Sequence, residues 1–256
     1  MADELPLARR DLIAVRLAEG QSVASVQLAA EFGVSEDAIR RDLRALAAEG
    51  LCRRVYGGAL PLTAKPISAR LGDGMDRKRV LAARAAGLVG RGELVFLDSS
   101  SAHVLLADAL PEDFGLTVAT NSVDVAAAVL ARQDIDLLMI GGAVDAAVGG
   151  AVDAVAVAAV SHLAIDLSFI GVCGVSAANG VGAEYHADAR FKRTVMAMSR
   201  RSAALVTSDK FAARAPYRVA EISAFSQFVV EQDAPEALLA DLKGAGAEVL
   251  SAGDPI

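Results

Sequence analysis

Tryptophan is absent from this chain, and aromatic residues make up only 4% of its 256 positions. There are two cysteines, Cys52 and Cys173, which lie far apart and form no C-x-x-C or Cys/His ligand spacing. The sequence therefore predicts neither a disulfide framework nor a zinc site, and it fits a reducing compartment. The three histidines, His103, His162 and His186, are too scattered for a metal centre, so we expect no metal and no cofactor.

A long, uninterrupted apolar run is also missing. The least charged segment, Leu167 to Ala183, is interrupted by glycines, which fits a buried strand and a loop better than a membrane-spanning helix. The first residues are acidic and lack the basic segment and apolar stretch of a secretory signal. We expect a cytoplasmic protein that has no membrane partner.

Basic residues are not in excess. The formal net charge is −7, and residues 1–60 contain eight Arg against nine Asp and Glu. Sequence-independent affinity for nucleic acid comes from Lys and Arg that neutralise phosphates, so the acidic balance excludes a protein that coats nucleic acid along its length. Any contact with DNA has to be local. The length and apolar content are sufficient for two packed cores, which predicts two domains, with a single domain as the alternative.

Residues 1–60 have the pattern of three short helices followed by a hairpin. Amphipathic stretches cover Ala8 to Glu19 and Ser25 to Phe32, and a turn follows at Gly33. Ser35 is a good N-cap for a third helix, which has acidic residues in its first turn and ends at Gly50. These signals predict a helix-turn-helix.

The third predicted helix has one apolar and one basic face. At about 100° per residue, Leu43 and Leu46 fall within about 40° of Ile39 and form a face that packs on the first two helices. Three arginines point away from that face: Arg40, Arg41 and Arg44. The chain after Gly50 has short strand character and a glycine pair, as in a wing, and it adds the candidates Arg53, Arg54 and Tyr56.

Two interpretations of the arginines are open at this point. An exposed row of arginines on a capped helix is the geometry with which a recognition helix enters the major groove, where Arg reads guanine. Ser35 at the start of that helix can then meet a backbone phosphate. The alternative is that the arginines only solvate the helix, which the near balance of charge in residues 1–60 favours. Their clustering on one face favours DNA.

The N-terminal sequence closely resembles the helix-turn-helix signature of the DeoR family. The matching residues are Phe32 to Leu43, Leu46, Glu49-Gly50-Leu51, Arg54 and Gly57-Gly58-Ala59. The resemblance implies DNA contacts from Ser35, Arg40, Arg41 and Arg54, and a structural role for Asp42 in orienting these groups. Two positions depart from the family pattern: Ala38 stands where Thr is usual, and Tyr56 where His is frequent. A hydroxyl contact to DNA is thereby lost, and Tyr56 takes the place of His in the wing.

Residues 61–75 contain prolines and glycines without clear periodicity, which predicts a linker between a domain at 1–60 and a second domain at 76–256. In the second domain, apolar runs alternate with Ala-rich helical stretches, which is typical of an α/β domain with a mainly parallel sheet. The expected strands are Leu94 to Leu97, Leu116 to Ala119, Ile135 to Ile140, Leu167 to Val172, and Ala203 to Val206.

A cluster of polar side chains follows the first of these strands and leads directly into a helical stretch. It consists of Asp98, Ser99, Ser100 and Ser101. Backbone N–H groups at the start of a helix attract anions, so a phosphate is the natural ligand of such a turn. The alternative is a Ser-rich turn that only caps the helix.

Polar residues also follow the next strands, and the carboxyl ends of parallel strands line one crevice. They are Thr120, Asn121 and Ser122 after the second strand, and Gly141 and Gly142 after the third. Charged residues further along are candidates for binding sugar hydroxyls or phosphate: Asp166, Glu184, Asp188, Lys192 and Lys210. Each of these can equally form a surface ion pair of little energetic value.

The polar residues in this order resemble the sensor domain of the DeoR family. The matching residues are Leu97 to Ser101, Thr120 to Ser122, Gly141-Gly142, Asp166 with Phe169-Ile170-Gly171, Gly180, and Lys192-Arg193. The resemblance implies a fold shared with ribose-5-phosphate isomerase and a phosphorylated sugar as effector, for which Asp166, Lys192 and Lys210 complete the predicted site. The family tends to have an acid three residues before the last lysine, where this chain has Thr207, which predicts a different partner for Lys210.

We therefore expect a homo-oligomeric, sequence-specific regulator that binds double-stranded operator DNA and is modulated by a phosphorylated sugar. Its C-terminal domain holds the dimer or tetramer and moves two recognition helices when the effector binds. Members of the family usually repress, so we expect repression of a carbohydrate or nucleoside catabolism operon. No residue is assigned a catalytic role, and we do not expect an enzyme.

Two alternatives remain. The first is a sugar-phosphate isomerase with an accessory helix-turn-helix, which needs a committed base that nothing in the chain requires. The second is a regulator whose pocket has lost its ligand, against which the intact segments Asp98 to Ser101 and Thr120 to Ser122 argue.

Overall fold

The computed structural model describes residues 6–18, 20–61, 74–213 and 215–253 of the chain. The chain divides into two compact units, Met1–Lys65 and Pro66–Ile256. The predicted linker at 61–75 falls mostly on residues 62–73, which lie outside the described residues. None of the helices in the described ranges is long and apolar enough to cross a membrane.

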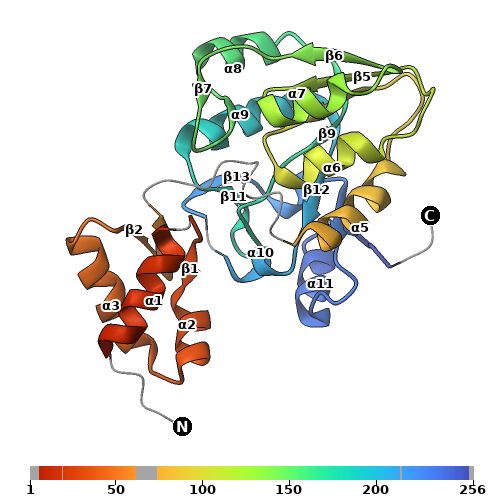
Figure 1. The fold of residues 1–256 in the computed structure, drawn as a ribbon. Coiled ribbons are helices and arrows are strands. Elements are labelled where there is room, and N and C mark those ends of the chain that lie inside the picture. Colours follow the sequence, from red (N-terminus) through yellow and green to blue (C-terminus); the bar gives the residue numbers. More distant parts are fainter. Residues whose placement is uncertain (1–5, 19, 62–73, 214, 254–256) are drawn as a thin grey trace. The chain divides into compact units, whose positions relative to one another are not determined.

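The first unit combines three helices with a small antiparallel sheet (Figure 1). The helices are α1 (Pro6–Ala18), α2 (Ser25–Phe32) and α3 (Glu36–Ala48), and the strands are β1 (Val23–Ala24), β2 (Cys52–Val55) and β3 (Gly58–Pro61). β3 lies between β1 and β2. The predicted helix-turn-helix with a hairpin wing is confirmed, and Glu19, the predicted end of the first helix, lies outside the described residues.

Capping and burial explain where α2 and α3 lie. Gly33 follows α2 in a left-handed conformation with φ of 63°, which glycine adopts without strain. Ser35 caps α3 as predicted, because its hydroxyl accepts a hydrogen bond from the backbone N–H of Ala38 at 3.3 Å. The core of the unit is formed mainly by Ile13, Leu17, Leu28, Ile39, Leu43 and Leu46.

The second unit is built on a seven-stranded sheet in which neighbouring strands are parallel. The strand order is β15-β14-β12-β9-β4-β5-β6. The strands are β4 (Leu94–Leu97), β5 (Leu116–Thr120), β6 (Ile135–Met139), β9 (Ile165–Phe169), β12 (Ser199–Val206), β14 (Gln227–Val230) and β15 (Glu248–Ser251). This confirms the predicted α/β class with a mainly parallel sheet.

Helices cover both faces of this sheet (Figure 1). One layer consists of α5 (Met75–Ala86), α6 (Ser101–Ala109) and α7 (Val123–Leu130), and the other of α8 (Ala154–Val160), α9 (His186–Ala197) and α11 (Glu236–Gly244). Alternate residues of a strand point to opposite faces. Phe96 of β4 therefore packs on Phe191 of α9, with 6.0 Å between ring centres, whereas Val95 and Leu97 belong to the other core.

Smaller elements complete the second unit. Strands β7 (Val144–Asp145) and β8 (Gly150–Ala151) form a hairpin. A second antiparallel sheet contains β10 (Gly174–Ser176), β11 (Gly180–Ala183) and β13 (Tyr217–Ala220). A short helix, α10 (Asp209–Ala212), follows β12, and a 3-10 helix, η1 (Ile222–Ala224), precedes β14.

All five predicted strands are present, but the bounds of two of them, β9 and β12, differ from the prediction by more than one residue. β9 starts at Ile165 and ends at Phe169 rather than reaching Val172, because the N–H of Gly171 binds a carboxylate instead of a neighbouring strand. β12 starts at Ser199 rather than Ala203, and its polar start is held by an ion pair between Arg201 and Glu93. The sequence pattern does not predict β14 and β15, each of which is only four residues long.

Candidate functional site

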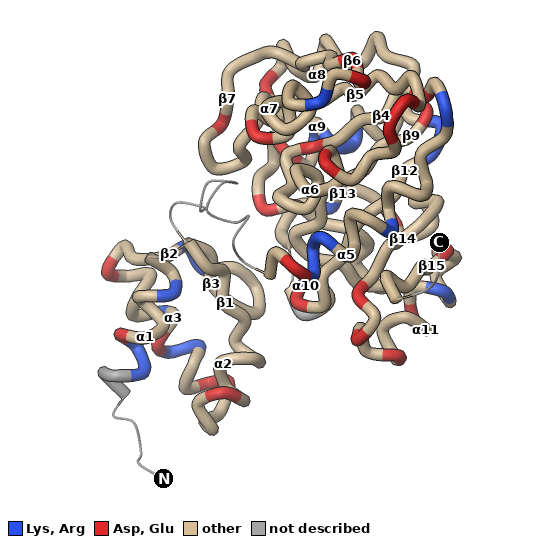
Figure 2. The backbone as a smooth tube through the Cα atoms, turned by 45° about the vertical axis from the view of Figure 1, so that its right-hand side comes forward, with Lys and Arg blue, Asp and Glu red and all other residues tan. Residues whose placement is uncertain are grey.

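The basic face of α3 is exposed. Arg40, Arg41 and Arg44 are exposed as predicted, whereas Ile39 and Leu43 are buried in the core of the unit. Figure 2 shows the basic positions of the first unit on α1, α3 and β2, with acidic positions between them. The clustering of arginine on one side of the helix, which composition alone does not show, is therefore a property of the folded unit.

The arginines of α3 interact with acidic residues of their own helix. The guanidinium of Arg40 lies 2.6 Å from Oε2 of Glu36 and 3.1 Å from Oδ1 of Asp37. Arg41 donates a hydrogen bond from Nε to the carbonyl oxygen of Asp37 at 3.3 Å. Exposed pairs of this kind are weak, so a phosphate or a guanine can displace them.

A tight turn forms the wing between β2 and β3. Gly57 has φ of 83°, and a Cβ on Gly58 would lie 2.0 Å from the carbonyl oxygen of Val23. Both positions therefore require glycine, the first for its conformation and the second for the close approach of two backbones. The glycine pair of the sequence is a structural requirement of the wing.

The wing carries the other predicted DNA contacts. Arg53 and Arg54 on β2 are exposed, and the side chain of Tyr56 at the tip is 80% exposed. A hollow of about 260 Å³ lies between the wing and α3, and its lining includes Arg40, Arg54 and Tyr56. The structure thus brings two arginines from different elements to one surface.

Asp42 has a different role from the predicted one. It is buried on the core side of α3, where its Oδ2 lies 2.7 Å from both Nε and Nη2 of Arg9 on α1. Its partner is thus a residue of the first helix and not an arginine of the basic face. Asp42 fixes the position of α3 on α1 rather than the orientation of individual DNA-facing side chains.

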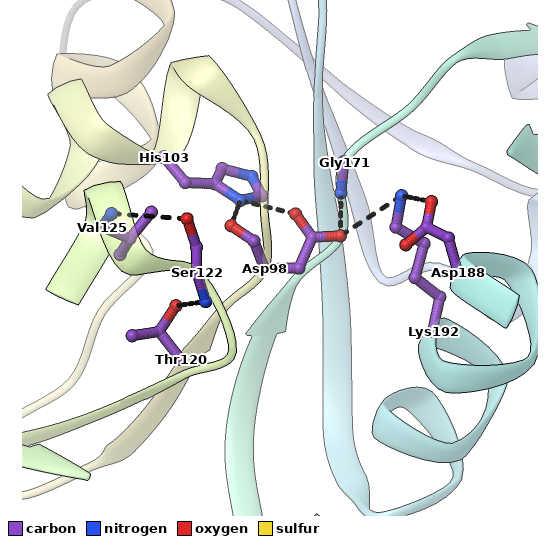
Figure 3. Close-up of polar contacts among 8 residues, drawn as sticks. All are labelled: Asp98, His103, Thr120, Ser122, Val125, Gly171, Asp188 and Lys192. Carbon is purple, nitrogen blue, oxygen red and sulfur yellow. Dashed lines mark hydrogen bonds and ion pairs between the residues drawn. The ribbon is translucent and has the colours of Figure 1, made fainter. Parts of the chain in front are cut away.

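In the second unit, polar residues meet at the carboxyl ends of the neighbouring strands β9, β4 and β5 (Figure 3). Asp98 follows β4 and is buried. Its Oδ2 accepts a hydrogen bond of 2.7 Å from the N–H of Gly171, which comes after β9. Its Oδ1 lies 2.9 Å from Nδ1 of His103 on α6, and that nitrogen also lies 3.2 Å from the carbonyl oxygen of Asp98. Because both neighbours are acceptors, Nδ1 carries the imidazole hydrogen.

Lys192 on α9 joins Asp98 to a second carboxylate. Its Nζ lies 3.6 Å from Oδ2 of Asp98 and 2.8 Å from Oδ2 of Asp188, and all three side chains are buried. Burial raises the pKa of Asp98, but the charges of Lys192 and His103 and the hydrogen bonds to Asp98 outweigh this effect, so the pKa is lowered. Burial lowers the pKa of Lys192, but the charges of Asp188 and Asp98 outweigh it, so that pKa is raised. Asp98 and Lys192 are therefore both ionised at neutral pH.

The serine turn does not serve as a side-chain cap. Ser100 is the N-cap residue of α6, but its side chain makes no capping hydrogen bond. Ser99 and Ser101 beside it are buried, and a Cβ on Gly171 would lie 2.9 Å from the Cβ of Ser100. The N–H of His103 bonds the carbonyl oxygen of Ser100 at 3.0 Å, and the N–H groups of Ser101 and Ala102 before it have no partner within the helix. The capping alternative for this turn therefore does not describe the structure.

Thr120, Asn121 and Ser122 form the neighbouring wall of the site. Thr120 Oγ1 accepts from the N–H of Ser122, and Ser122 Oγ caps α7 by accepting from Val125 (Figure 3). Asn121 exchanges hydrogen bonds with Ala151 of β8, one from its side-chain amide and one to its carbonyl oxygen. Within the described residues, the buried Oδ1 of Asn121 has no hydrogen-bond partner. It is a buried acceptor in the wall of the candidate site.

The predicted glycines after β6 lie beside this wall. Gly142 has φ of 141°, and a Cβ there would lie 2.5 Å from Oδ1 of Asp153 and 3.3 Å from the Cβ of Ala151. Asp153 caps α8 and accepts a further hydrogen bond from the N–H of Ala143. Gly141, by contrast, has open space around it. The loop is thereby joined to the segment that Asn121 holds.

Two of the predicted charged residues are placed differently. Asp166 is the second residue of β9 and accepts a hydrogen bond from the N–H of Leu94 at the start of β4, so it lies at the opposite edge of the sheet from Asp98. Lys210 is paired with Asp209 at 2.8 Å, which confirms that its partner is not at position 207. Lys210 nevertheless lies near the site, because it and Lys192 both act electrostatically on Cys173.

Sequence reasoning named Asp188 and Lys192 as candidate ligand-binding residues, but it missed His103 as a member of the Asp98 cluster and Gly171 as a partner of Asp98. Asp188 and Lys192 are four residues apart on α9, a spacing that predicts an ion pair on one helix face. His103 lies in the first turn of α6, and no sequence signal relates it to Asp98. Gly171 also gives no sign of its contact with Asp98, because the two belong to strands far apart in the chain. Among the described residues, no group of three or more His, Cys, Asp or Glu is placed to hold a metal ion.

Two family models match the chain. The model described as the DeoR-like helix-turn-helix domain matches residues 9–64, and the model described as the DeoR C terminal sensor domain matches residues 74–232. The first match contains the basic face of α3 and the wing, and the second contains the Asp98 cluster. The resemblance drawn from the sequence is confirmed for both parts of the chain.

Curated relatives match over most of their length. The putative aga operon transcriptional repressor of Escherichia coli O157:H7 is 28% identical over 96% of this chain and 94% of that protein. The glycerol-3-phosphate regulon repressor of Haemophilus influenzae is 29% identical over 90% of this chain and 91% of that protein. Among solved structures, ribose 5 phosphate isomerase A from Neisseria gonorrhoeae matches with a TM-score of 0.40 and 15% identity over 54% of each chain.

Proposed function

Because the chain belongs to the DeoR family of transcription regulators, we propose that it represses a carbohydrate or nucleoside catabolism operon and responds to a phosphorylated sugar. The observation that carries the proposal is the exposed arginine surface of α3 and the wing in the first unit. The two relatives named above are a putative operon repressor and a regulon repressor, and they match over nine-tenths or more of this chain. The regulator interpretation is therefore favoured over the isomerase alternative.

In the DNA complex, α3 enters the major groove of double-stranded operator DNA. Arg40, Arg41 and Arg44 lie on the helix side that faces the base edges, and Ser35 lies at the helix start, where backbone N–H groups meet a phosphate. The wing residues Arg53, Arg54 and Tyr56 contact the flanking backbone or minor groove. Base contacts give specificity, and phosphate contacts set the register.

The effector binds across the carboxyl ends of β4 and β5. Lys192 is already paired with two carboxylates, so the phosphate of the effector goes to the N–H groups and hydroxyls at the start of α6, from Ser99 to Ser101. Sugar hydroxyls donate to the acceptors on the other side, Asp98 and Oδ1 of Asn121. We leave Asp166 out of the site, since it lies at the opposite edge of the sheet.

The regulator acts in the cytoplasm as a homo-oligomer, a dimer or a tetramer, held by the second unit. Large apolar side chains are exposed on the elements around the edge strand β6, and these are Val123, Leu130, Leu138, Met139, Val144 and Val155. Exposed apolar surface of this extent is typical of a contact between copies. Two first units then meet successive major grooves, and the effector shifts the equilibrium by its differential affinity for one arrangement.

A gel shift on the intergenic DNA upstream of the gene, at stated salt, tests the proposal. We expect specific binding that is lost in Arg40→Ala/Arg41→Ala and retained in Arg190→Ala, a matched control at an exposed arginine of α9. A panel of sugar phosphates is then added, and one of them should change the affinity. Absence of specific binding by the intact chain under all these conditions would contradict the DNA-binding proposal, and isomerase activity on the same panel would support the alternative.

A further inference from the structure

A second polar pocket lies at the carboxyl edge of the sheet, where α5 begins and β14 and β15 end. It encloses about 360 Å³ and is lined by Arg77, Val80, Glu231, Gln232, Asp233 and Ala252. β14 is three strands away from β4, which is about 14 Å at the usual strand spacing, so this pocket is separate from the Asp98 cluster. Its size is at the lower end of the range of about 300–1,000 Å³ for pockets that hold small molecules.

A buried carboxylate lines this pocket. The side chain of Glu231 is only 5% exposed. Its Oε2 accepts a hydrogen bond of 2.7 Å from the N–H of Ser208 and lies 3.1 Å from Nη1 of Arg77. Its Oε1 is buried and has no hydrogen-bond partner among the described residues, and the same is true of the hydroxyl oxygen of Ser208. A buried charged acceptor is costly to leave unsatisfied, so this oxygen indicates a missing donor.

The rim of the pocket is charged and accessible. Arg77 and Asp233 are 57% and 61% exposed, and Nη2 of Arg77 lies 2.6 Å from Oδ2 of Asp233. One guanidinium therefore serves two carboxylates, Glu231 and Asp233, which leaves an excess of negative charge. Val80 and Ala252 add apolar surface beside these groups. The missing donor is thus better supplied by a cation than by a neutral group, and an anion is disfavoured.

We propose that this pocket binds a small molecule through a protonated primary amine. Its ammonium group donates to Oε1 of Glu231, and its carbon chain lies against Val80 and Ala252. The pocket is then a second ligand site on the sensor unit, built from other strands than those of the effector site. This inference does not depend on the proposed DNA contacts or on the identity of the phosphorylated effector.

Three probes with the same four-carbon chain test the proposal on the full chain by calorimetry and ligand-observed NMR at pH 7. They are 4-amino-1-butanol, 1,4-butanediol and 4-hydroxybutyrate, which end in an ammonium, a hydroxyl and a carboxylate. We expect the amine to bind at least tenfold more tightly than the diol and the carboxylate not to saturate. Equal binding of all three, or tightest binding of the carboxylate, overturns the proposal.

Two variants locate the site. Glu231→Gln should weaken binding of 4-amino-1-butanol at least tenfold, and Asp233→Asn, at a residue that is 61% exposed, should weaken it about threefold by the loss of one charge. Asp241→Asn on α11 is the control for loss of an exposed carboxylate elsewhere. If the amine does not bind and Glu231→Gln instead changes the mass measured by light scattering, the pocket is a contact between copies and the proposal is wrong.

Discussion

Asp42 of α3 and Arg9 of α1 form an ion pair at 2.7 Å in which each side chain is only 9% exposed. The pair joins α3 to α1 on the buried side of α3, away from its exposed arginines. Removal of one partner leaves the other charge buried without compensation, which is more damaging than loss of an exposed pair.

We expect Asp42→Ala to lower the free energy of unfolding of the first unit by about 3 kcal/mol. Arg10→Ala is the matched control, because Arg10 and Glu49 also join α1 to α3, at 3.5 Å but in an exposed position, where the expected loss is below about 1 kcal/mol. Urea unfolding of the full chain, followed by circular dichroism, compares the two. Similar losses in both variants would show that the buried Arg9–Asp42 pair contributes no more to the free energy of unfolding than the exposed pair.

Neutralising an acidic residue of α3 should raise the affinity for DNA. Glu36 holds the guanidinium of Arg40 at 2.6 Å and brings a negative charge near DNA phosphates. Glu36→Gln should raise affinity for DNA of unrelated sequence by about two- to fivefold and steepen its salt dependence. Glu49→Gln changes the net charge equally at the other end of α3 and should have a smaller effect in the same titration. An unchanged affinity in Glu36→Gln would mean that this pair does not restrain Arg40.

Removal of Lys192 from the Asp98 cluster should reverse the pH dependence of stability. In the wild type the pKa of Asp98 is lowered, so its contribution to stability is present above the ordinary pKa of 3.8 and is lost as the pH falls through the folded value. Lys192→Met removes the main compensating charge, and burial then raises the pKa of Asp98, so folding is opposed as the pH rises above about 4. Lys192→Met should therefore melt at a higher temperature at pH 4 than at pH 7.

Lys243→Met, at an exposed position of α11, is the control for this experiment and should keep the wild-type pH profile. Melting temperatures of both variants and of the wild type are measured between pH 4 and pH 8. If Lys192→Met follows the wild-type profile, the two buried carboxylates are not the groups that Lys192 stabilises.

Substitution of Gly171 should weaken the response to the effector. A Cβ at this position would lie 2.9 Å from Oδ1 of Asp98 and 2.9 Å from the Cβ of Ser100, so Gly171→Ala displaces both groups. We expect the sugar-phosphate concentration needed to alter the gel shift to rise at least about tenfold, which corresponds to about 1.4 kcal/mol, while DNA affinity without effector is unchanged. Gly244→Ala, which has open space around the new Cβ, is the control. An unaltered response would place effector binding elsewhere.

The sequence by itself determined most of the first unit. Gly33, the cap at Ser35, and the apolar and basic faces of α3 are all local patterns, in which each residue interacts with neighbours a few positions away. The same holds for the alternation of strands and helices in the second unit. The structure therefore confirms these elements, although the sequence pattern did not predict β14 and β15.

Only the tertiary structure decided which side chains meet. Asp98 follows β4, but its partners Gly171 and Lys192 come from segments that the strand order brings beside it. The same order places Asp166 at the opposite edge, because it stands at the start of a parallel strand rather than at its end. Asp42 and Glu231 likewise pair with residues that are far away in the chain, Arg9 and Arg77 respectively. Such contacts depend on the order and direction of strands and on helix packing, which the local pattern of residues does not specify.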